Sequence, residues 1–457
     1  MIDLKTIVKA YDVRGTVPDQ LDETVARALG AAFVDVTGAA RLVTAHDMRD
    51  SGPALARAFA DGARSRGAEV VATGLASTDM LYFASGHLDL PGAMFTASHN
   101  PARYNGIKMC RAGAVPIGQD TGLDEIRDRA QAYLAEGGPG AGDGPPSTEL
   151  SVLADYAAYL RGLVDLANVR PLTVAVDAGN GMAGYTVPAV LGADKLDALP
   201  LDIVPLYFEL DGTFPNHEAN PLEPSNLIDL QKKVIEVGAD IGLAFDGDAD
   251  RCFFIDANGD AVSPSAITAL VAARELAKHP GATILHNLIT SRAVPEVIAE
   301  HGGVAVRTRV GHSFIKAEMA RTGAVFGGEH SAHYYFEDFW RADTGMLAAL
   351  HVLAALGEQS RSLAEITAEY DRYCASGEIN STVTDQAASV AAVLAAFADR
   401  TADVDELDGH TVSLRDGSWF NVRASNTEPL LRLNVEAADE ATMAAIRDEA
   451  LAVIRRG

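Results

Sequence analysis

Three aspartates stand close together in the sequence Asp246-Gly-Asp-Ala-Asp-Arg251, directly after a short apolar run. Three carboxylates at a strand end would repel one another, so a hard divalent cation is their natural neutraliser. The spacing does not fit an EF-hand loop, whose sixth and twelfth positions would be Arg251 and Ala257 in place of Gly and Glu. A solvated acidic turn is the alternative interpretation. We expect Asp246, Asp248 and Asp250 to bind a metal ion, Mg²⁺ above all.

A hydroxyl and an imidazole lie side by side in Thr96-Ala-Ser-His-Asn-Pro101, where Ser98 precedes His99. Neighbouring side chains do not normally converge in a strand, so this pair alone does not indicate a hydrolase dyad. The GxSxG turn of serine hydrolases is also absent around Ser98. Taken by itself, the motif fits an ordinary turn as well as a reactive serine.

An anion site is indicated near the C-terminus, in Arg423-Ala-Ser-Asn-Thr. Its guanidinium, two hydroxyls, amide and backbone N–H groups are the donors that bind phosphate oxygens. The donors are Arg423, Ser425, Asn426 and Thr427. Further local positive charge is available from Arg14, Lys108 and Arg251. Each of these cations, taken alone, is equally typical of a surface residue or an ion-pair partner.

The glycine-rich segment Gly179-Asn-Gly-Met-Ala-Gly184 matches the GxGxxG pattern of dinucleotide-binding proteins. It follows an apolar run that predicts a strand. No other motif indicates hydride transfer, however. We therefore interpret the segment as a tight connection between a strand and a helix.

The elements that position these motifs recur three times as alternating strands and helices, a pattern typical of parallel α/β units. In each repeat, a polar motif directly follows the third strand. Because ligands bind outside the carboxyl ends of the strands in such sheets, the three motifs could face one cleft. Polar loops after strands are also common without any function. The predicted strands are 41–45, 68–73 and 93–96; 172–176, 202–208 and 240–245; and 282–286, 303–307 and 324–327.

Helices are predicted between and after these strands, and the C-terminal part differs in composition. The predicted helices are 51–66, 77–86, 225–237 and 312–321. From about residue 372 the pattern predicts helices at 386–399 and 439–455 and strands at 411–415, 418–423 and 430–435. This last part is expected to form a smaller α+β domain.

The length of 457 residues is too great for one hydrophobic core, and residues 137–148 are so rich in Gly and Pro that they predict a linker. We place four domains at 1–145, 146–254, 255–370 and 371–457. The expected fold class is α/β: three similar domains with mixed, mostly parallel sheets, and a C-terminal α+β domain, around a central cleft.

The overall charge narrows the choice of partners. Acidic residues number 63 and basic residues 37, giving a formal net charge of −26, which argues against nucleic acid or a membrane as partner.

The three cysteines are far apart, which excludes a disulfide framework and a zinc motif. Neither a signal peptide nor eighteen consecutive apolar residues occur, so we expect a cytoplasmic protein. The oligomeric state is left open.

Taken together, the motifs TASHNP, DGDADR, GEHS and RASNTEP, in this order and spacing, resemble the α-D-phosphohexomutase superfamily. Asn426 after Ser425 resembles the phosphomannomutase/phosphoglucomutase branch, since the phosphoglucosamine branch typically has Gly there. The resemblance covers essentially the whole chain. It implies a phosphotransferase that interconverts hexose 6-phosphate and hexose 1-phosphate through a phosphoserine enzyme and a bound hexose 1,6-bisphosphate.

The resemblance also implies roles for individual residues. Ser98 would carry the phosphoryl group and, with Asp246, Asp248 and Asp250, bind Mg²⁺. Proton transfer or charge stabilisation would fall to residues that include Arg14, His99, Lys108 and Arg251, although no single general base is assigned. Substrate would contact Tyr11, His312, Glu329, Ser331, His333, Arg423, Ser425, Asn426 and Thr427. The sequence differs from the family pattern at two places that would contact the sugar. Ala332 stands where the family often has Gly, and residues 286–290 lack a Lys that some bacterial relatives have.

Mannose phosphates are the expected substrates, with a phosphoglucomutase or a dual-specificity mutase as the alternative. Glu329 and Ser331 are expected to hold hydroxyls that both epimers share, so discrimination at C2 should be loose. A sugar phosphatase and a non-catalytic sugar-phosphate-binding protein are rival interpretations. A binding module would have no need for Ser98 and all three aspartates.

Overall fold

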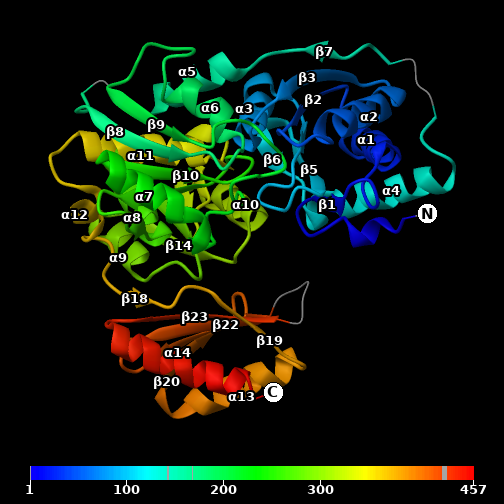
Figure 1. Cartoon of the computed structure of the whole chain (residues 1–457). Coiled ribbons are helices and arrows are strands. Elements are labelled where there is room, and N and C mark those ends of the chain that lie inside the picture. The colour runs from blue at the N-terminus through cyan, green and yellow to red at the C-terminus, as the bar shows by residue number, and fades with distance from the viewer. Residues whose placement is uncertain (1, 141–143, 167, 425–429, 457) are drawn as a thin grey trace. The chain divides into compact units, whose positions relative to one another are not determined.

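The computed structural model describes residues 2–140, 144–166, 168–424 and 430–456, without the side chains of residues 312 and 313 (Figure 1). The chain divides into two compact units. One comprises Met1–Val262 and Ser331–Ala364, and the other Ser263–His330 and Glu365–Gly457. Four α/β domains with mixed sheets make up these units, and the C-terminal sheet is antiparallel, which confirms the predicted fold class.

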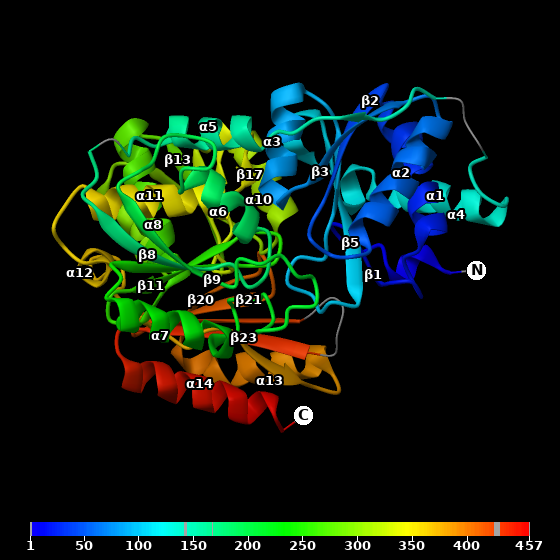
Figure 2. The same ribbon diagram turned by 45° about the horizontal axis from the view of Figure 1, so that its top comes forward.

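The first sheet has the strand order β1-β5-β4-β2-β3-β7, with β6 paired to β5. Strands β2, β3, β4 and β7 run parallel, whereas β5 runs antiparallel to β1 and β4. Helices α1, α2 and α4 cover one face of this sheet and α3 covers the other (Figures 1 and 2). The bounds are β1 Val13–Thr16, α1 Glu23–Thr37, β2 Arg41–His46, α2 Gly52–Ser65, β3 Glu69–Leu75, α3 Thr78–Leu88, β4 Gly92–Phe95, β5 Tyr104–Arg111, β6 Val115–Pro116, α4 Leu123–Ala135 and β7 Thr148–Glu149.

The second sheet has the order β12-β11-β10-β8-β9, in which β8, β9 and β10 are parallel. The same unit contains the β16–β17 hairpin and the buried helix α11. The bounds are α5 Leu153–Leu163, β8 Leu172–Asp177, α6 Ala183–Val190, β9 Leu201–Leu206, α7 Ile228–Val237, β10 Ile241–Phe245, β11 Cys252–Asp256, β12 Ala261–Val262, β16 Tyr334–Phe336, β17 Ala342–Asp343 and α11 Gly345–Gly357.

The other unit holds the parallel set β14-β13-β15 and the antiparallel sheet β18-β23-β22-β21-β20, to which β19 adds through β23. Helices α13 and α14 pack on the antiparallel sheet to form a separate core around Phe397 and Phe420. The bounds are α8 Pro264–Lys278, β13 Thr283–Asn287, α9 Ala293–Glu300, β14 Val304–Thr308, α10 His312–Thr322, β15 Phe326–Gly328, α12 Leu363–Thr367, β18 Cys374–Ala375, β19 Ile379–Thr382, α13 Gln386–Phe397, β20 Thr401–Asp405, β21 His410–Leu414, β22 Trp419–Ala424, β23 Leu430–Ala437 and α14 Glu440–Ile454. Helix α12 lies where the chain passes from the first unit to the second.

Every strand and helix predicted from the sequence is present, with ends displaced by a few residues. The helix expected at 77–86 is α3, which begins one residue later because Ser77 caps it, its Oγ accepting from the N–H of Met80. The GxGxxG segment does form the turn between β8 and α6, as predicted. In the expected linker, residues 137–140 and 144–147 belong to no helix or strand. Across the described residues, no helix is long and apolar enough to cross a membrane.

Strand β5 was not predicted, although it positions a residue of the site. Its sequence, from Tyr104 to Arg111, mixes Asn, Gly and Lys with apolar residues and shows no regular alternation. All six of its inner residues are nevertheless buried. A strand buried on both faces between β1 and β4 has no solvent-facing side to impose a period of two.

Candidate active site

The serine motif forms a tight loop after β4, which ends at Phe95. Ser98 lies in the left-handed backbone region, with φ of 48°, and only 3% of its surface is exposed. Its N–H donates to Oγ1 of Thr96 at 2.9 Å. Its hydroxyl donates to Oδ2 of Asp246 at 2.7 Å. Two motifs separated by 148 residues therefore meet, as the strand-end argument predicted.

The backbone of this loop is held by Arg49, which the sequence did not identify. Its two Nη atoms donate to four carbonyl oxygens: those of Ser98 at 2.9 Å, Asn100 at 2.6 Å, Pro101 at 3.0 Å and Tyr104 at 2.9 Å. The side chain is 1% exposed, and its Nε lies 3.3 Å from Oδ2 of Asp47. Only a planar guanidinium offers this many fixed donors, so Arg49 constrains the loop that carries Ser98.

A glycine lets the acidic loop approach the serine loop. A Cβ atom on Gly247 would lie 2.4 Å from the carbonyl oxygen of Ser98, well inside contact distance. Any side chain at this position would therefore push the two loops apart. The close approach explains why glycine separates the first two aspartates.

The acidic loop follows β10 and is almost completely buried, with Asp246, Asp248 and Asp250 at most 1% exposed. Two cations lie among the three carboxylates. Lys108, on β5, donates from Nζ to Oδ2 of Asp248 at 2.7 Å and to Oδ2 of Asp250 at 2.6 Å. Arg251 donates from Nη2 to Oδ2 of Asp246 at 2.7 Å. When all three carboxylates are ionised, they exceed the two cations by one negative charge, which a bound metal cation would neutralise.

The donor set fits a hard divalent cation. One oxygen from each of the three carboxylates lies within 4.8 Å of the others. Among the described residues, Oδ1 of Asp248 and Oδ1 of Asp250 have no hydrogen-bond partner, although both are buried. Buried carboxylate oxygens are costly to leave unsatisfied, and they are the ligands that Mg²⁺ prefers. A second such group joins Asp250 to His333 and Asp343.

Burial and the two cations shift the titration of these groups in opposite directions. Burial raises the pKa of Asp246 to about 7, although Arg251 opposes the shift. Burial would also raise the pKa of Asp248, but Lys108 and a hydrogen bond from Thr78 outweigh it and lower that pKa. The carboxylates of Asp248 and Asp250 in turn raise the pKa of Lys108 despite its own burial. Lys108 therefore stays protonated.

Two predicted histidines lie in this unit, in different environments. The Nδ1 atom of His99 lies 3.2 Å from Oγ of Ser98 and accepts from Nη2 of Arg251 at 2.7 Å. Burial, together with the charge of Arg251, lowers the pKa of His99 to about 2, so its ring is neutral. His333 is more exposed, its Nδ1 lies 2.9 Å from Oγ of Ser331, and its Nε2 lies 3.8 Å from Oδ1 of Asp250.

Arg14 is attached to the serine loop from the side of β1. Its Nη1 donates to the carbonyl oxygen of Ala97 at 3.2 Å and to Oδ1 of Asn100, while its Nε lies 2.8 Å from Asp12. Tyr11 lies half-buried in the bend before β1. The structure thus brings together Arg14, Ser98, His99, Lys108, Asp246, Asp248, Asp250, Arg251 and His333 in one compact unit.

Of the other predicted substrate residues, Ser331 belongs to the first unit, whereas His312, Glu329 and Arg423 belong to the second. Glu329 is 1% exposed, and its Oε1 accepts from Asn287 at 3.3 Å and from the N–H of Gly311 at 3.1 Å. Gly311 is the N-cap of α10, whose first residue is His312. Arg423, at 6% exposure, donates to Glu378 and lies 3.8 Å from Asp408. Ser425, Asn426 and Thr427 lie outside the described residues.

Two residues that position the site were not predicted from the sequence. Asp47 and Arg49 are polar residues directly after β2. Polar residues after a strand were the signal that identified the other motifs, so the same signal could have identified Arg49. Thr78 is the first residue of α3, and its hydroxyl donates to Oδ2 of Asp248 at 2.5 Å. A threonine at a helix start is so common that its type carries no such signal.

The fold and the serine–aspartate site together define a phosphotransferase of the mutase class that acts on hexose phosphates. Four family models match along the chain: phosphoglucomutase/phosphomannomutase alpha/beta/alpha domain I at 5–136, domain II at 154–259, domain III at 263–373, and the C-terminal domain at 378–453. The chain belongs to the phosphoglucomutase/phosphomannomutase family.

Several relatives match over nearly their full length. The chain is 42% identical over 455 residues to the phosphohexose mutases of Xanthomonas campestris pv. campestris, covering 98% of this chain and 99% of that one. It is 39% identical over 457 residues to the phosphomannomutase of Salmonella typhimurium, covering 98% of each. The crystal structure of a phosphoglucomutase/phosphomannomutase family protein from Burkholderia thailandensis superposes with a TM-score of 0.89 at 32% identity, covering 100% of this chain and 98% of that one.

Proposed function

We propose that the enzyme interconverts mannose 6-phosphate and mannose 1-phosphate, with Ser98 as the phosphoryl carrier and a hexose 1,6-bisphosphate as the bound intermediate. The observation that carries this proposal is the buried Ser98 hydroxyl, 2.7 Å from Asp246 and 3.5 Å from Nη2 of Arg251. A serine placed between a carboxylate and a guanidinium, inside a loop fixed by Arg49, is prepared to give and receive a charged group.

The reaction consists of two transfers of opposite direction. In the first, the bond between phosphorus and Oγ of Ser98 breaks, a new bond forms to the free hydroxyl of the hexose phosphate, and the proton of that hydroxyl ends on Oγ of Ser98. The bisphosphate then turns end for end. In the second, its other phosphoryl group returns to Oγ of Ser98, and the proton of Oγ ends on the sugar oxygen that is released. Lys108 and Arg251 offset the charge on the moving group.

We propose that Asp246, Asp248, Asp250 and an oxygen of phosphorylated Ser98 hold Mg²⁺. The bound ion would supply electrostatic stabilisation of the transferring phosphoryl group. The unpartnered Oδ1 atoms of Asp248 and Asp250, within the described chain, support this assignment. His99, neutral and hydrogen-bonded to Arg251, would keep that guanidinium directed at Ser98.

Substrate recognition would fall to residues that lie outside the serine and acidic loops. Arg423, with Ser425, Asn426 and Thr427, would bind the phosphate that is not being transferred. Glu329 and Ser331 would hold ring hydroxyls, and Tyr11, His312 and His333 would line the same substrate. We place the domain boundaries at residues 145, 254 and 370. The four domains would then carry the phosphoserine, bind the metal, recognise the sugar and bind the substrate phosphate, in this order.

The test is a coupled assay on mannose 1-phosphate and glucose 1-phosphate, each with a hexose 1,6-bisphosphate primer, before and after chelation. We expect both sugars to turn over, mannose phosphate faster, with kcat/KM values within roughly a hundredfold because a shared hydroxyl grip discriminates little. Chelator should stop turnover and Mg²⁺ should restore it. Faster turnover of glucose 1-phosphate would support the phosphoglucomutase alternative, and turnover of neither sugar would refute the proposal.

A further inference from the structure

The N-terminus of α3 reaches the middle of the acidic loop. Thr78, its first helical residue, is fully buried and lies 170 residues before its partner Asp248. Its Oγ1 donates to Oδ2 of Asp248 at 2.5 Å, and its backbone N–H donates to the carbonyl oxygen of the same residue at 3.0 Å. One threonine therefore holds both the side chain and the main chain of this aspartate.

The two carboxylate oxygens of Asp248 have different surroundings. Oδ2 accepts from Thr78 and from Nζ of Lys108, at 2.5 and 2.7 Å. Oδ1 is buried and has no hydrogen-bond partner within the described part of the chain. When one oxygen of a carboxylate is held by hydrogen bonds, the other oxygen points in a fixed direction. In metalloproteins, hydrogen bonds to a metal ligand orient that ligand in the same way.

We infer that Thr78 is a positioning residue for the metal site, fixing Asp248 so that Oδ1 faces the cation. This inference rests on the proposed magnesium site. Lys108 alone would fix the carboxylate less well, because its ammonium ends a flexible stem and is shared with Asp250. The hydroxyl of Thr78 is directed only at Asp248 and carries no charge, so it orients the ligand without competing with the metal.

The start of α3 is itself firmly held. Asp79, the next residue, is fully buried, and its Oδ2 accepts from the hydroxyl of Tyr156 at 2.6 Å and from Oγ1 of Thr344 at 2.8 Å. Its Oδ1 accepts from the hydroxyl of Ser77, the N-cap of the helix. Thr78 is thus placed between two anchored neighbours and has little freedom to move with Asp248.

The test measures Mn²⁺ binding to the full-length, unphosphorylated protein by electron paramagnetic resonance, with no substrate present. Thr78→Val removes the hydroxyl and keeps the shape, and should weaken Mn²⁺ binding by about 10- to 100-fold. Thr78→Ser keeps the hydroxyl and should bind within about threefold of wild type. Thr186→Val is the matched control, because Thr186 is also buried but its hydroxyl donates within its own helix, to the carbonyl of Met182.

The outcomes separate this inference from the site on which it rests. If wild type binds no Mn²⁺, or Asp248→Asn binds it as well as wild type, the proposed metal site fails and this inference fails with it. If Asp248→Asn loses affinity but Thr78→Val does not, Thr78 has no positioning role. Equal losses in Thr78→Ser and Thr78→Val would also overturn the inference, since the hydroxyl would then not matter. Should Thr78→Val fail to fold, Thr78→Ala serves as the second hydroxyl-free variant with the same expected loss.

Discussion

The serine loop and the region around Glu329 and Arg423 are held in different ways. Around Ser98, groups from other segments fix the backbone: Arg49 donates to four carbonyls and Arg14 to one. Glu329 instead accepts a hydrogen bond from Asn287, and Arg423 donates one to Glu378, and both partners belong to the same unit as the residue they contact. If Glu329 and Arg423 contact substrate as proposed, they must exchange these partners when it binds, whereas the backbone of the serine loop is already held in the free protein.

The largest effect is expected from adding a side chain where the acidic loop approaches the serine loop. Gly247→Ala places a Cβ atom 2.4 Å from the carbonyl oxygen of Ser98, so one loop must move. A displacement of about 1 Å at a reacting group lowers the rate by about 100-fold, and kcat should fall by at least that factor. Steady-state kinetics measures it, with Gly162→Ala as a control because a Cβ there meets no neighbour within 4 Å and the backbone is not left-handed. Unchanged kcat in Gly247→Ala would show that the loops are not rigidly placed.

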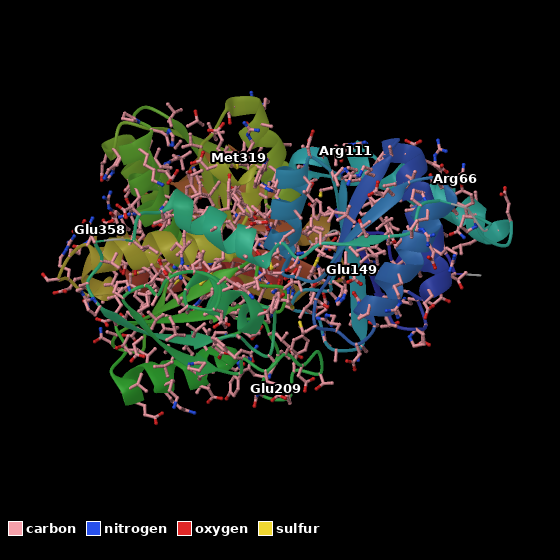
Figure 3. The ribbon with its side chains drawn as sticks, turned by 90° about the horizontal axis from the view of Figure 1, so that it is seen from above. Arg66, Arg111, Glu149, Glu209, Met319 and Glu358 are labelled. Atoms are coloured by element: carbon pink, nitrogen blue, oxygen red, sulfur yellow. The ribbon has the colours of Figure 1, made fainter. Side chains whose placement is uncertain are left out.

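A somewhat smaller effect is expected when the serine loop loses its guanidinium. Arg49→Lys keeps the charge but cannot supply four donors in one plane, so kcat should fall by about 10- to 100-fold while KM changes little. Arg66→Lys is the control: Arg66 lies at the outer side of the same domain, half-exposed, with Nε 2.9 Å from Asp35 (Figure 3). If KM rose and kcat did not fall, Arg49 would act on substrate binding and not on the loop.

A substitution at Glu329 should lower kcat/KM for both sugars together. Glu329→Gln keeps an oxygen that can accept from Asn287 and Gly311 but removes the charge. We expect kcat/KM for mannose and glucose phosphates to fall by a similar factor, about tenfold, because the grip is on hydroxyls that both share. Glu318→Gln on the surface of α10 controls for charge alone, since its partner is the neighbouring Arg321. A loss confined to one epimer would show that Glu329 reads C2.

The smallest effect on turnover is expected at Asp79, where stability changes instead. Burial raises the pKa of Asp79 to about 6, so the folded protein holds this proton more tightly than the unfolded chain does. Its contribution to stability is therefore present at low pH and is lost as pH rises from about 4 to about 6, by roughly 3 kcal/mol at ~1.4 kcal/mol per pKa unit. In Asp79→Asn, the free energy of unfolding, measured by urea unfolding between pH 4 and 7, should lose this decrease with pH. If the free energy of unfolding of Asp79→Asn ran parallel to that of wild type between pH 4 and 7, the assignment would be contradicted.

Much of the chemistry was predictable because it lies in short segments at strand ends. The rule that ligands bind at the carboxyl ends of parallel strands singles out Ser98 after β4 and Asp246 after β10. These strands belong to different sheets, so the contact between the two residues also depends on how the two domains of the first unit pack. Arg49 was missed although its place after β2 carries the same strand-end signal. Thr78 was not predicted, because a threonine at a helix start carries no such signal and only the folded chain shows its contact with Asp248, 170 residues away. Ala332, noted as a replacement for glycine, has a φ of 63°, so the structure keeps the left-handed turn that glycine would adopt more easily.

The proposed role of Ser98 as phosphoryl carrier is tested by locating the transferred phosphoryl group. The purified enzyme is incubated with glucose 1,6-bisphosphate, and its intact mass and peptides are analysed alongside those of Ser98→Ala. We expect one added phosphoryl group, on Ser98, and loss of nearly all mutase turnover in Ser98→Ala. Full turnover by Ser98→Ala, or a phosphoryl group on another residue, would contradict it.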